Sequence, residues 1–336
     1  MKLFELKCFN EKSPITQYNR ALHIYVIFFA VCTLILIYMG GLIKTLNAGL
    51  SVPDWPLSWG GFNPPRWTEI ETVRAEHSHR LMATFVGLLS IGLNIWVWKK
   101  VKTSKWFKWL VTASLIAVIT QGLLGGITVL FYLPDAISMS HATLAQIFLL
   151  INVSIAVFAS SKWSVPSQKV EARTSGLPIQ YIFLTTLGTI FIQLILGAWV
   201  RHTESGLAIS DFPLSNGKLI PEFTDIHVIA AYSHRVWAIV VSGMIIWSSI
   251  SVFKNYRDVK PLFKTALLML ILLCCQVTLG AFIIWTERST IITTLHVPVG
   301  ALTLGTTYYL VLQSFRLIAK PEHIFQTNLK ASVNPS

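Results

Sequence analysis

Eight long apolar stretches, separated by short polar segments, dominate the pattern of the chain. They cover residues 21–43, 78–98, 109–131, 140–160, 179–200, 228–253, 265–285 and 291–315. A helix of roughly 20 apolar residues is long enough to cross the hydrocarbon core of a bilayer. The pattern therefore predicts an all-α integral membrane protein with eight transmembrane helices and no soluble domain.

The composition is typical of the same class. Hydrophobic residues make up 53% of the chain, charged residues only 12%, and the mean hydropathy is +0.60. The first apolar stretch is longer than the apolar core of about 7–15 residues in a signal peptide, and no small-residue cleavage site follows it. We therefore expect this stretch to remain in the protein as its first membrane helix.

Lysine and arginine are concentrated on one side of the predicted membrane. Of the 27 such residues, 19 fall in the N-terminal tail, the connections at 99–108, 161–178 and 254–264, and the C-terminal tail. The positive-inside rule makes this side the cytoplasm, so both termini are expected there. Topology and contact with anionic lipid heads then explain the net charge of +12, and no nucleic-acid partner is expected.

The second half of the chain repeats the first. The segment Glu-His-Ser-His-Arg at 76–80 recurs as Ala-Tyr-Ser-His-Arg at 231–235, an offset of 155 residues that also relates His141 to His296. The segments that follow the first and fifth stretches align at an offset of 157. Their matched pairs are Gly40/Gly197, Lys44/Arg201, Gly49/Gly206, Leu50/Leu207, Asp54/Asp211, Pro56/Pro213, Leu57/Leu214, Ser58/Ser215 and Gly60/Gly217.

The repeat predicts two four-helix bundles. Four helices per copy mean that both copies enter the membrane in the same direction, so the pseudo-twofold axis should lie along the membrane normal, as in a parallel repeat. The expected regions are a cytoplasmic tail at 1–20, an N-terminal bundle at 21–163, a cytoplasmic linker at 164–178, a C-terminal bundle at 179–315 and a cytoplasmic tail at 316–336.

Two histidines in each half are predicted in the outer parts of even-numbered helices: His79 with His141, and His234 with His296. An ionisable side chain inside a membrane helix usually marks a functional site. Neutral imidazoles that face one another across a four-helix bundle can ligate haem iron from both sides. A metal-ion site or a proton relay could use the same imidazoles, and a single histidine could simply bond a neighbouring helix.

Glu76 is the most informative difference between the halves, because Ala231 occupies the matching place. It lies one turn before His79 on the same helix face, so it could act on a group bound there. The alternative is an ion pair with Arg80, four residues later. Arg80 and Arg235, each next to a candidate ligand, could hold haem propionates through charge-assisted hydrogen bonds.

Three other histidines have smaller expected roles. His77 points to a different face from His79, so we expect it to contact a loop or to support the site from outside. His227 lies two turns before His234 and could meet a propionate or a water. His202 is expected in a loop and exposed to solvent.

The cysteines do not predict a disulfide. The chain has four, Cys8, Cys32, Cys274 and Cys275. None lies in a predicted outer loop, where an oxidising compartment would favour a structural disulfide. Those in the membrane helices are expected to act as small apolar packing residues.

Five motifs, taken together, are typical of one family. They are Gly-Leu-Ser-Val-Pro-Asp-Trp-Pro at 49–56, Glu-His-Ser-His-Arg at 76–80, His-Ala-Thr-Leu-Ala-Gln at 141–146, Ser-His-Arg-Val-Trp-Ala at 233–238 and His-Val-Pro-Val-Gly-Ala at 296–301. With them the chain resembles haem A synthases, membrane enzymes that oxidise a ring methyl of haem O to the formyl group of haem A for cytochrome oxidase. Some members carry an outer-loop cysteine pair that this chain lacks, so a thiol role does not transfer.

The resemblance implies a role for each half. The N-terminal half would bind haem O as substrate, with Glu76, His79 and His141 as catalytic residues and the two histidines as ligands of its iron. The C-terminal half would hold one haem b cofactor through His234 and His296. The resemblance further implies a bacterial plasma membrane location, with haem sites toward the outer face, and handover of haem O from haem O synthase. The sequence identifies neither the electron acceptor nor whether the protein is a homo-oligomer.

Two other functions fit part of the pattern. A di-haem b-type electron carrier would need the four histidines, but it leaves the Glu76/Ala231 difference and the paired outer loops without a role. A transporter built on a parallel repeat would need the repeat but no haem. The haem content of the purified protein separates these functions from a haem A synthase.

Overall fold

The computed structural model describes residues 18–165, 167–173 and 176–319, and this part of the chain is helical. Eight of its helices are long and apolar enough to cross a membrane. They are α1 (Arg20–Thr45), α2 (Glu71–Lys100), α3 (Lys105–Leu130), α4 (Asp135–Phe158), α6 (Ile179–His202), α7 (Ile226–Asn255), α8 (Lys260–Trp285) and α9 (Thr290–Leu317). The predicted all-α fold with eight membrane helices is confirmed.

Several helices extend beyond the apolar stretches that predicted them. α2 begins at Glu71 rather than at residue 78, and α9 continues to Leu317. The hydropathy pattern marks only the lipid-covered turns, whereas backbone hydrogen bonds continue the helix into polar sequence. Two short elements lie between the membrane helices, α5 (Ser161–Ser164) and the 3-10 helix η2 (Ser205–Leu207). The expected tails fall largely outside the described residues, as does Cys8.

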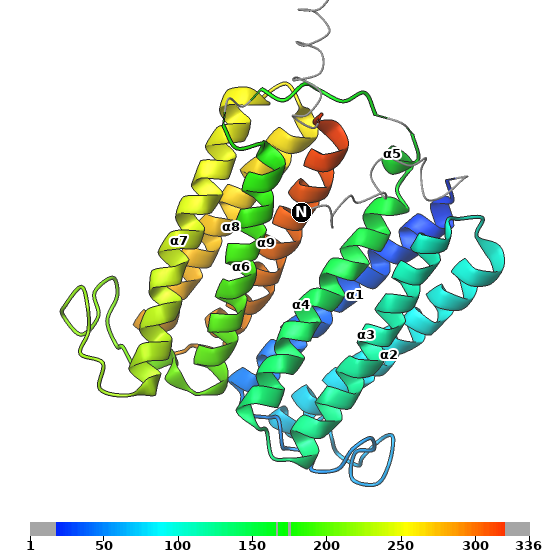
Figure 1. Cartoon of the computed structure of the whole chain (residues 1–336). Helices are drawn as coiled ribbons and strands as arrows, with labels where there is room; N and C mark the ends of the chain where they lie inside the picture. The colour runs from blue at the N-terminus through cyan, green and yellow to red at the C-terminus, as the bar shows by residue number, and fades with distance from the viewer. Residues whose placement is uncertain (1–17, 166, 174–175, 320–336) are drawn as a thin grey trace, which may run out of the picture.

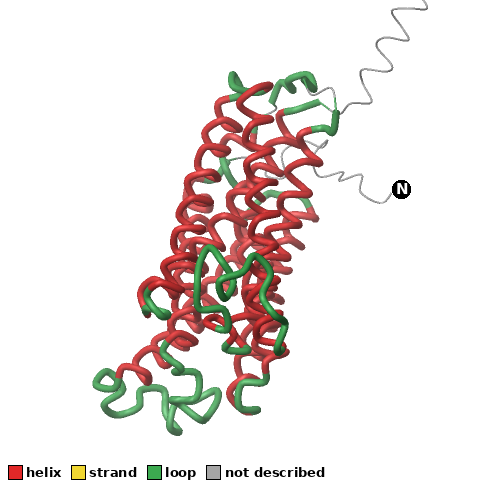
Figure 2. Tube along the Cα trace, turned by 90° about the vertical axis from the view of Figure 1, so that its left-hand side faces the viewer, coloured by secondary structure: helices red, strands yellow, loops and turns green. Residues whose placement is uncertain are grey.

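The helices form two neighbouring groups, α1–α4 and α6–α9 (Figure 1). Each group encloses its own apolar core, which includes Phe148 in the first and Tyr256 in the second. The groups meet where α1 and α4 contact α9 and α6, with Ala301 buried against Leu149. Figure 2 shows the helices running side by side with the loops mostly at their ends. The division into domains and the orientation of a pseudo-twofold axis stay predictions.

Arginines anchor the two longest loops, at 46–70 and 203–225, which lie at one end of the helices, here called the long-loop end. Arg80 of α2 donates to three carbonyl oxygens of the first loop, and Arg235 of α7 donates to three of the second. The acceptors are Val52, Asp54 and Leu57 for Arg80, at 2.6–2.8 Å, and Ile209, Asp211 and Leu214 for Arg235, at 2.7–2.9 Å. The residue after His79 and the residue after His234 therefore each hold a loop over their own helix group.

Each anchored loop also contains a turn closed by an aspartate. Asp54 accepts hydrogen bonds from two backbone amides, one of them that of Gly60 at 2.7 Å, and Asp211 does the same with Gly217 at 2.7 Å. Gly60 and Gly217 have φ values of 73° and 74°, which glycine adopts without the steric cost of a side chain. The amides of Gly217 and Asn216 lower the pKa of the Asp211 carboxyl.

The connection between the groups packs against the second one. Val170 donates to the carbonyl oxygen of Leu317 at 2.7 Å and accepts from Ala319 at 2.8 Å. Arg173 pairs with Asp258 in the connection between α7 and α8. The described part of the predicted linker is therefore attached to the α6–α9 group rather than spanning freely between the groups.

Candidate functional site

Each of the four candidate ligand histidines lies against a glycine on the preceding helix. A Cβ atom at the glycine would come within 3.1–3.5 Å of Cε1 of the imidazole. The pairs are Gly40 with His79, Gly125 with His141, Gly197 with His234, and Gly280 with His296. A Cβ atom at Gly125 or Gly197, at 3.3 and 3.1 Å, would crowd the imidazole, whereas at Gly40 and Gly280, at 3.4 and 3.5 Å, it would only touch the ring.

Glutamines hold three of the four histidine segments. Gln121 donates to the carbonyl oxygen of His141 at 2.8 Å, and Gln276 donates to that of His296 at 3.1 Å. Gln193 donates to the carbonyl oxygen of His234 at 3.0 Å, and its Nε2 lies 3.2 Å from Nδ1 of that ring. Gln193 was missed in the sequence. The feature that could have identified it is an amide side chain within an apolar membrane helix.

The imidazoles form one pair in each group and suit haem iron. His79 and His141 lie within electrostatic range of each other, as do His234 and His296. Nδ1 of His79, His141 and His296 is buried without a hydrogen-bond partner in the described structure. Two imidazoles complete the coordination of iron that a porphyrin already binds through four nitrogens.

The same donors do not suit a bare metal ion. Among residues 18–165, 167–173 and 176–319, no three His, Cys, Asp or Glu side chains gather as metal ligands. A structural or catalytic metal ion usually takes three or four ligands from the protein. The donor set, two buried imidazoles in each group, therefore fits haem.

Glu76 is buried and bonded through both oxygens. It is 3% exposed; Oε1 lies 2.5 Å from Nη2 of Arg80, and Oε2 accepts from the amide of Val52 at 2.9 Å. The ion pair expected as the alternative role of Glu76 is thus present. The pair also ties Glu76 to the first loop, because Val52 belongs to that loop. Ala231 gives the second group no such carboxylate.

Arg80 and Arg235 are engaged by the loops. Every hydrogen bond of Arg235 in the described structure goes to a loop carbonyl, and Arg80 bonds loop carbonyls and Glu76. These contacts do not support the predicted contact with propionates, which stays a prediction. The sequence could not reveal this engagement, because the acceptors are backbone carbonyls more than twenty residues away.

Two of the other histidines also contact loops. His77 is 3% exposed, with Nδ1 3.0 Å from Oγ of Ser58 and its ring 4.8 Å from that of Trp67, so the expected loop contact is confirmed. His227 places Nδ1 2.9 Å from Oγ of Ser205. The prediction for His202 was wrong: it ends α6 and is half-buried, because the helix continues past the apolar stretch.

A buried polar layer distinguishes the first group. Asn152 accepts from Oγ of Ser114 at 2.6 Å and donates to Oγ1 of Thr33 at 3.0 Å. Ser90 is 1% exposed, and its Oγ has no partner in the described structure. Asn152 and Ser90 each follow a candidate histidine, His141 or His79, by 11 residues, about three helical turns, and so lie on the same helix faces.

The second group has a mainly apolar layer at the matching positions. The repeat offsets match Thr33, Ser90, Ser114 and Asn152 with Ile190, Ile245, Met269 and Thr307. All four of these residues are buried. The interiors of the two groups therefore differ in polarity below the histidines, as they differ at Glu76 above them.

The first loop also packs directly on α3. A Cβ atom at Gly126 would lie 2.6 Å from the ring of Trp55, so the indole occupies the space of a side chain there. Gly126 is next to Gly125, which faces His141. The matching residues in the second half are Phe212 and Ala281. The aromatic ring there is smaller than that of Trp55, and the residue at the place of Gly126 carries a methyl side chain. The first loop thus covers its group close to a candidate ligand.

The sequence profile of the cytochrome oxidase assembly protein family matches residues 23–308. The chain belongs to this family. Relatives named haem A synthase are similar along nearly the whole chain. That of Alkalihalophilus pseudofirmus is 29% identical over 308 residues, covering 91% of this chain and 100% of the relative. That of Halalkalibacterium halodurans is 28% identical over 297 residues, covering 88% and 97%.

A third relative, the haem A synthase of Bacillus licheniformis, is 28% identical over 276 residues, covering 80% of this chain and 88% of the relative. Membership confirms the resemblance to haem A synthases that the five motifs indicated. Neither the electron carrier nor the transporter is favoured by these similarities. The chain is a membrane protein of the haem A synthase family, whose members take part in cytochrome oxidase assembly.

Proposed function

We propose that this protein oxidises a ring methyl group of haem O to a formyl group and so produces haem A. Family membership and the names of the relatives support a haem-modifying oxidoreductase. The observation that carries the assignment is Glu76, a buried carboxylate one turn from His79. Its absence from the second half, where Ala231 stands, supports different roles for the two histidine pairs.

In this proposal the α1–α4 group binds the substrate and the α6–α9 group binds a cofactor. His79 and His141 hold the iron of haem O, and His234 and His296 hold the iron of one haem b. The glycine contacts and the unpartnered Nδ1 atoms of His79, His141 and His296 support imidazoles that are kept available for ligation. In the second pair, Nε2 of Gln193 lies 3.2–3.4 Å from both ring nitrogens of His234, and Nε2 of Gln276 lies 3.2 Å from that of His296. When bound, haem b supplies one-electron redox chemistry, and its protein ligands tune the potential.

Glu76 is the residue that we assign to the reacting methyl group. With water as the source of oxygen, oxidation of the methyl to the alcohol, and of the alcohol to a hydrate that then loses water, each releases two protons and passes two electrons to an external acceptor. A carboxylate beside the reacting carbon can accept a proton or stabilise a developing positive charge. Arg80 and the amide of Val52 support this role, because their hydrogen bonds to the two carboxylate oxygens fix the orientation of Glu76.

Haem extraction from cells that also make haem O tests the proposal. Wild-type protein should yield haem A, and the Glu76→Gln variant should accumulate haem O or its hydroxylated form at an unchanged protein level. Glu69→Gln is the matched control, because Glu69 is an exposed acid that pairs only with Arg66, three residues before it. Its haem A yield should equal that of the wild type, as resolved by chromatography of the extracts.

The same extracts separate the rival functions. Wild-type protein that contains haem b but never converts supplied haem O would indicate an electron carrier. Protein without any haem absorbance would indicate a transporter. A normal haem A yield from Glu76→Gln would leave the enzyme assignment intact but remove Glu76 from the chemistry.

A further inference from the structure

Most cations at the long-loop end already have a local partner. Eight lysines and arginines lie there: Lys44, Arg66, Arg74, Arg80, Arg201, Lys218, Arg235 and Arg288. Arg66 and Lys218 form exposed ion pairs with carboxylates three or four residues away. Arg74 donates to a carbonyl of the first loop, and Arg80 and Arg235 anchor the two loops. The other three cations, Lys44, Arg201 and Arg288, bond residues that lie far from them in the sequence.

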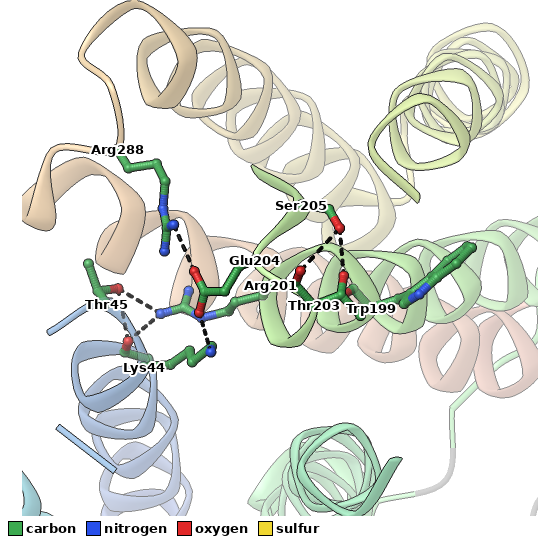
Figure 3. A network of polar contacts seen from close by, with 9 residues as sticks. Lys44, Thr45, Trp199, Arg201, Thr203, Glu204, Ser205 and Arg288 are labelled. Carbon is green, nitrogen blue, oxygen red and sulfur yellow. Dashed lines mark hydrogen bonds and ion pairs between the residues drawn. The ribbon is translucent and has the colours of Figure 1, made fainter. Parts of the chain in front are cut away.

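These three cations surround a single carboxylate where the two helix groups meet (Figure 3). Lys44 pairs with Oε1 of Glu204, and Nη1 of Arg288 lies 2.8 Å from Oε2 of the same side chain. Arg201 donates through Nη2 to the carbonyl oxygen of Gly41 and, at 2.7 Å, to Oγ1 of Thr45. The cluster has three positive charges and one negative charge, so two positive charges are not neutralised by its own residues.

The cluster lies next to the histidine sites. Arg201 follows Gly197, which packs against His234, by four residues and so lies one turn closer to the long-loop end on the same helix face. Arg201 is also within electrostatic range of His296. Arg288 lies in the connection just before α9. His296 is the seventh residue of α9. Both arginines therefore lie beside the mouth of the α6–α9 group.

Both guanidinium groups keep donors available. In the described structure Arg201 uses only Nη2, and Arg288 uses only Nη1, in hydrogen bonds and ion pairs. Lys44 shares the charge of Glu204, which reduces the repulsion that this carboxylate would exert on another anion nearby. Half-buried cations at a membrane protein interior are costly without a counter-charge. The surplus of two matches the two carboxylates that a haem carries.

We propose that Arg201 and Arg288 bind the propionate carboxylates of the haem held by His234 and His296. The inference rests on the proposed function only in assuming that this group binds a haem. Arginine suits the task, because its planar fork of N–H donors matches a carboxylate. Arg201 in addition links that haem to the first group, since the same side chain bonds Gly41, the neighbour of Gly40 against which His79 packs.

Titration with two forms of the ligand tests this site. Haem-free, full-length protein is titrated with haem b and with its dimethyl ester, in which both carboxylates are blocked. The second-half signal is defined as the six-coordinate absorbance that His296→Ala removes. Arg201→Gln and Arg288→Gln should each weaken binding of haem b about 10-fold or more, as expected for loss of a charge-assisted hydrogen bond. Neither change should alter binding of the ester.

Control variants separate ligand binding from folding. Lys218→Gln removes another cation of the long-loop end, one that is paired with Glu222. This change should leave binding of both ligands unchanged. Arg201→Lys should recover part of the affinity for haem b. Equal weakening of haem b and ester by Arg201→Gln and Arg288→Gln, or no weakening at all, would overturn the site. Wild-type protein that binds neither ligand would instead contradict the proposed function itself.

Discussion

Glu76 Oε1 lies 2.5 Å from Nη2 of Arg80, and the same guanidinium group holds three carbonyl oxygens of the first loop. The ion pair therefore connects the helix that carries His79 with the loop that covers the first group. It does so through a carboxylate that the second group lacks. Arg235 makes the same three loop contacts without a carboxylate partner. This difference allows the contribution of the ion pair to be measured against an internal reference.

Arg80→Gln should destabilise the protein more than Arg235→Gln. The first change leaves the buried Glu76 carboxylate without its cation, a loss of about 3–5 kcal/mol for a buried pair. The second removes hydrogen bonds between a charged group and carbonyls, worth about 2 kcal/mol. Thermal unfolding in detergent checks the order. The double variant Glu76→Gln/Arg80→Gln should recover part of the loss; equal effects of the two single changes would mean that the ion pair contributes nothing.

Gly197→Ala should disturb haem ligation without weakening the helix. The added Cβ would lie 3.1 Å from Cε1 of His234, closer than nine in ten real Cβ contacts, while alanine favours a helix over glycine by about 1 kcal/mol. Gly188→Ala in the same helix α6 is the matched control, because nothing lies within 4 Å of its Cβ position. We expect altered haem absorbance for Gly197→Ala only. Identical spectra for both variants would show that the glycine does not position the ring.

His234→Ala and His296→Ala should each yield an assembled membrane protein that has lost its haem b. The two imidazoles are the histidines of the α6–α9 group that the repeat matches with His79 and His141. Absorbance spectroscopy of the purified variants measures the loss, with His227→Ala as the control because His227 contacts Ser205 in the loop. Full six-coordinate haem b spectra in both variants would contradict the ligand assignment.

The turn closed by Asp211 should loosen in acid. Amide hydrogen bonds lower the pKa of its carboxyl below the ordinary 3.8, so the carboxylate stabilises the folded loop at any pH above that value. The contribution is lost as the pH falls through the lowered pKa. Limited proteolysis of the loop at 203–225 should therefore accelerate at acidic pH in the wild type. Asp211→Asn should be cleaved faster at neutral pH and should show a smaller acid-dependent step; the pKa values of Asp225 and Glu204 in the same loop are also lowered, so part of the step remains.

The histidine pairs could be predicted from the sequence, whereas most of their supporting residues could not. The repeat offset singled out His79, His141, His234 and His296, because a pattern that occurs twice is visible without any structure. The glycine that faces each ring lies on another helix, so its role depends on packing. Gln193 was missed for the same reason, since its partner His234 is 41 residues away.

The eight membrane helices could be predicted from the chain alone, because a bilayer leaves the backbone no other hydrogen-bond partners and a helix must be about 20 residues long to cross it. The duplication could be predicted because the same residues recur at a fixed offset. Which charged side chains meet depends instead on the packing of the whole molecule. Lys44 and Glu204 are 160 residues apart, and Arg80 bonds carbonyls whose residue type carries no signal. Such contacts depend on how the two helix groups and their loops pack, which local hydrophobic patterning does not specify.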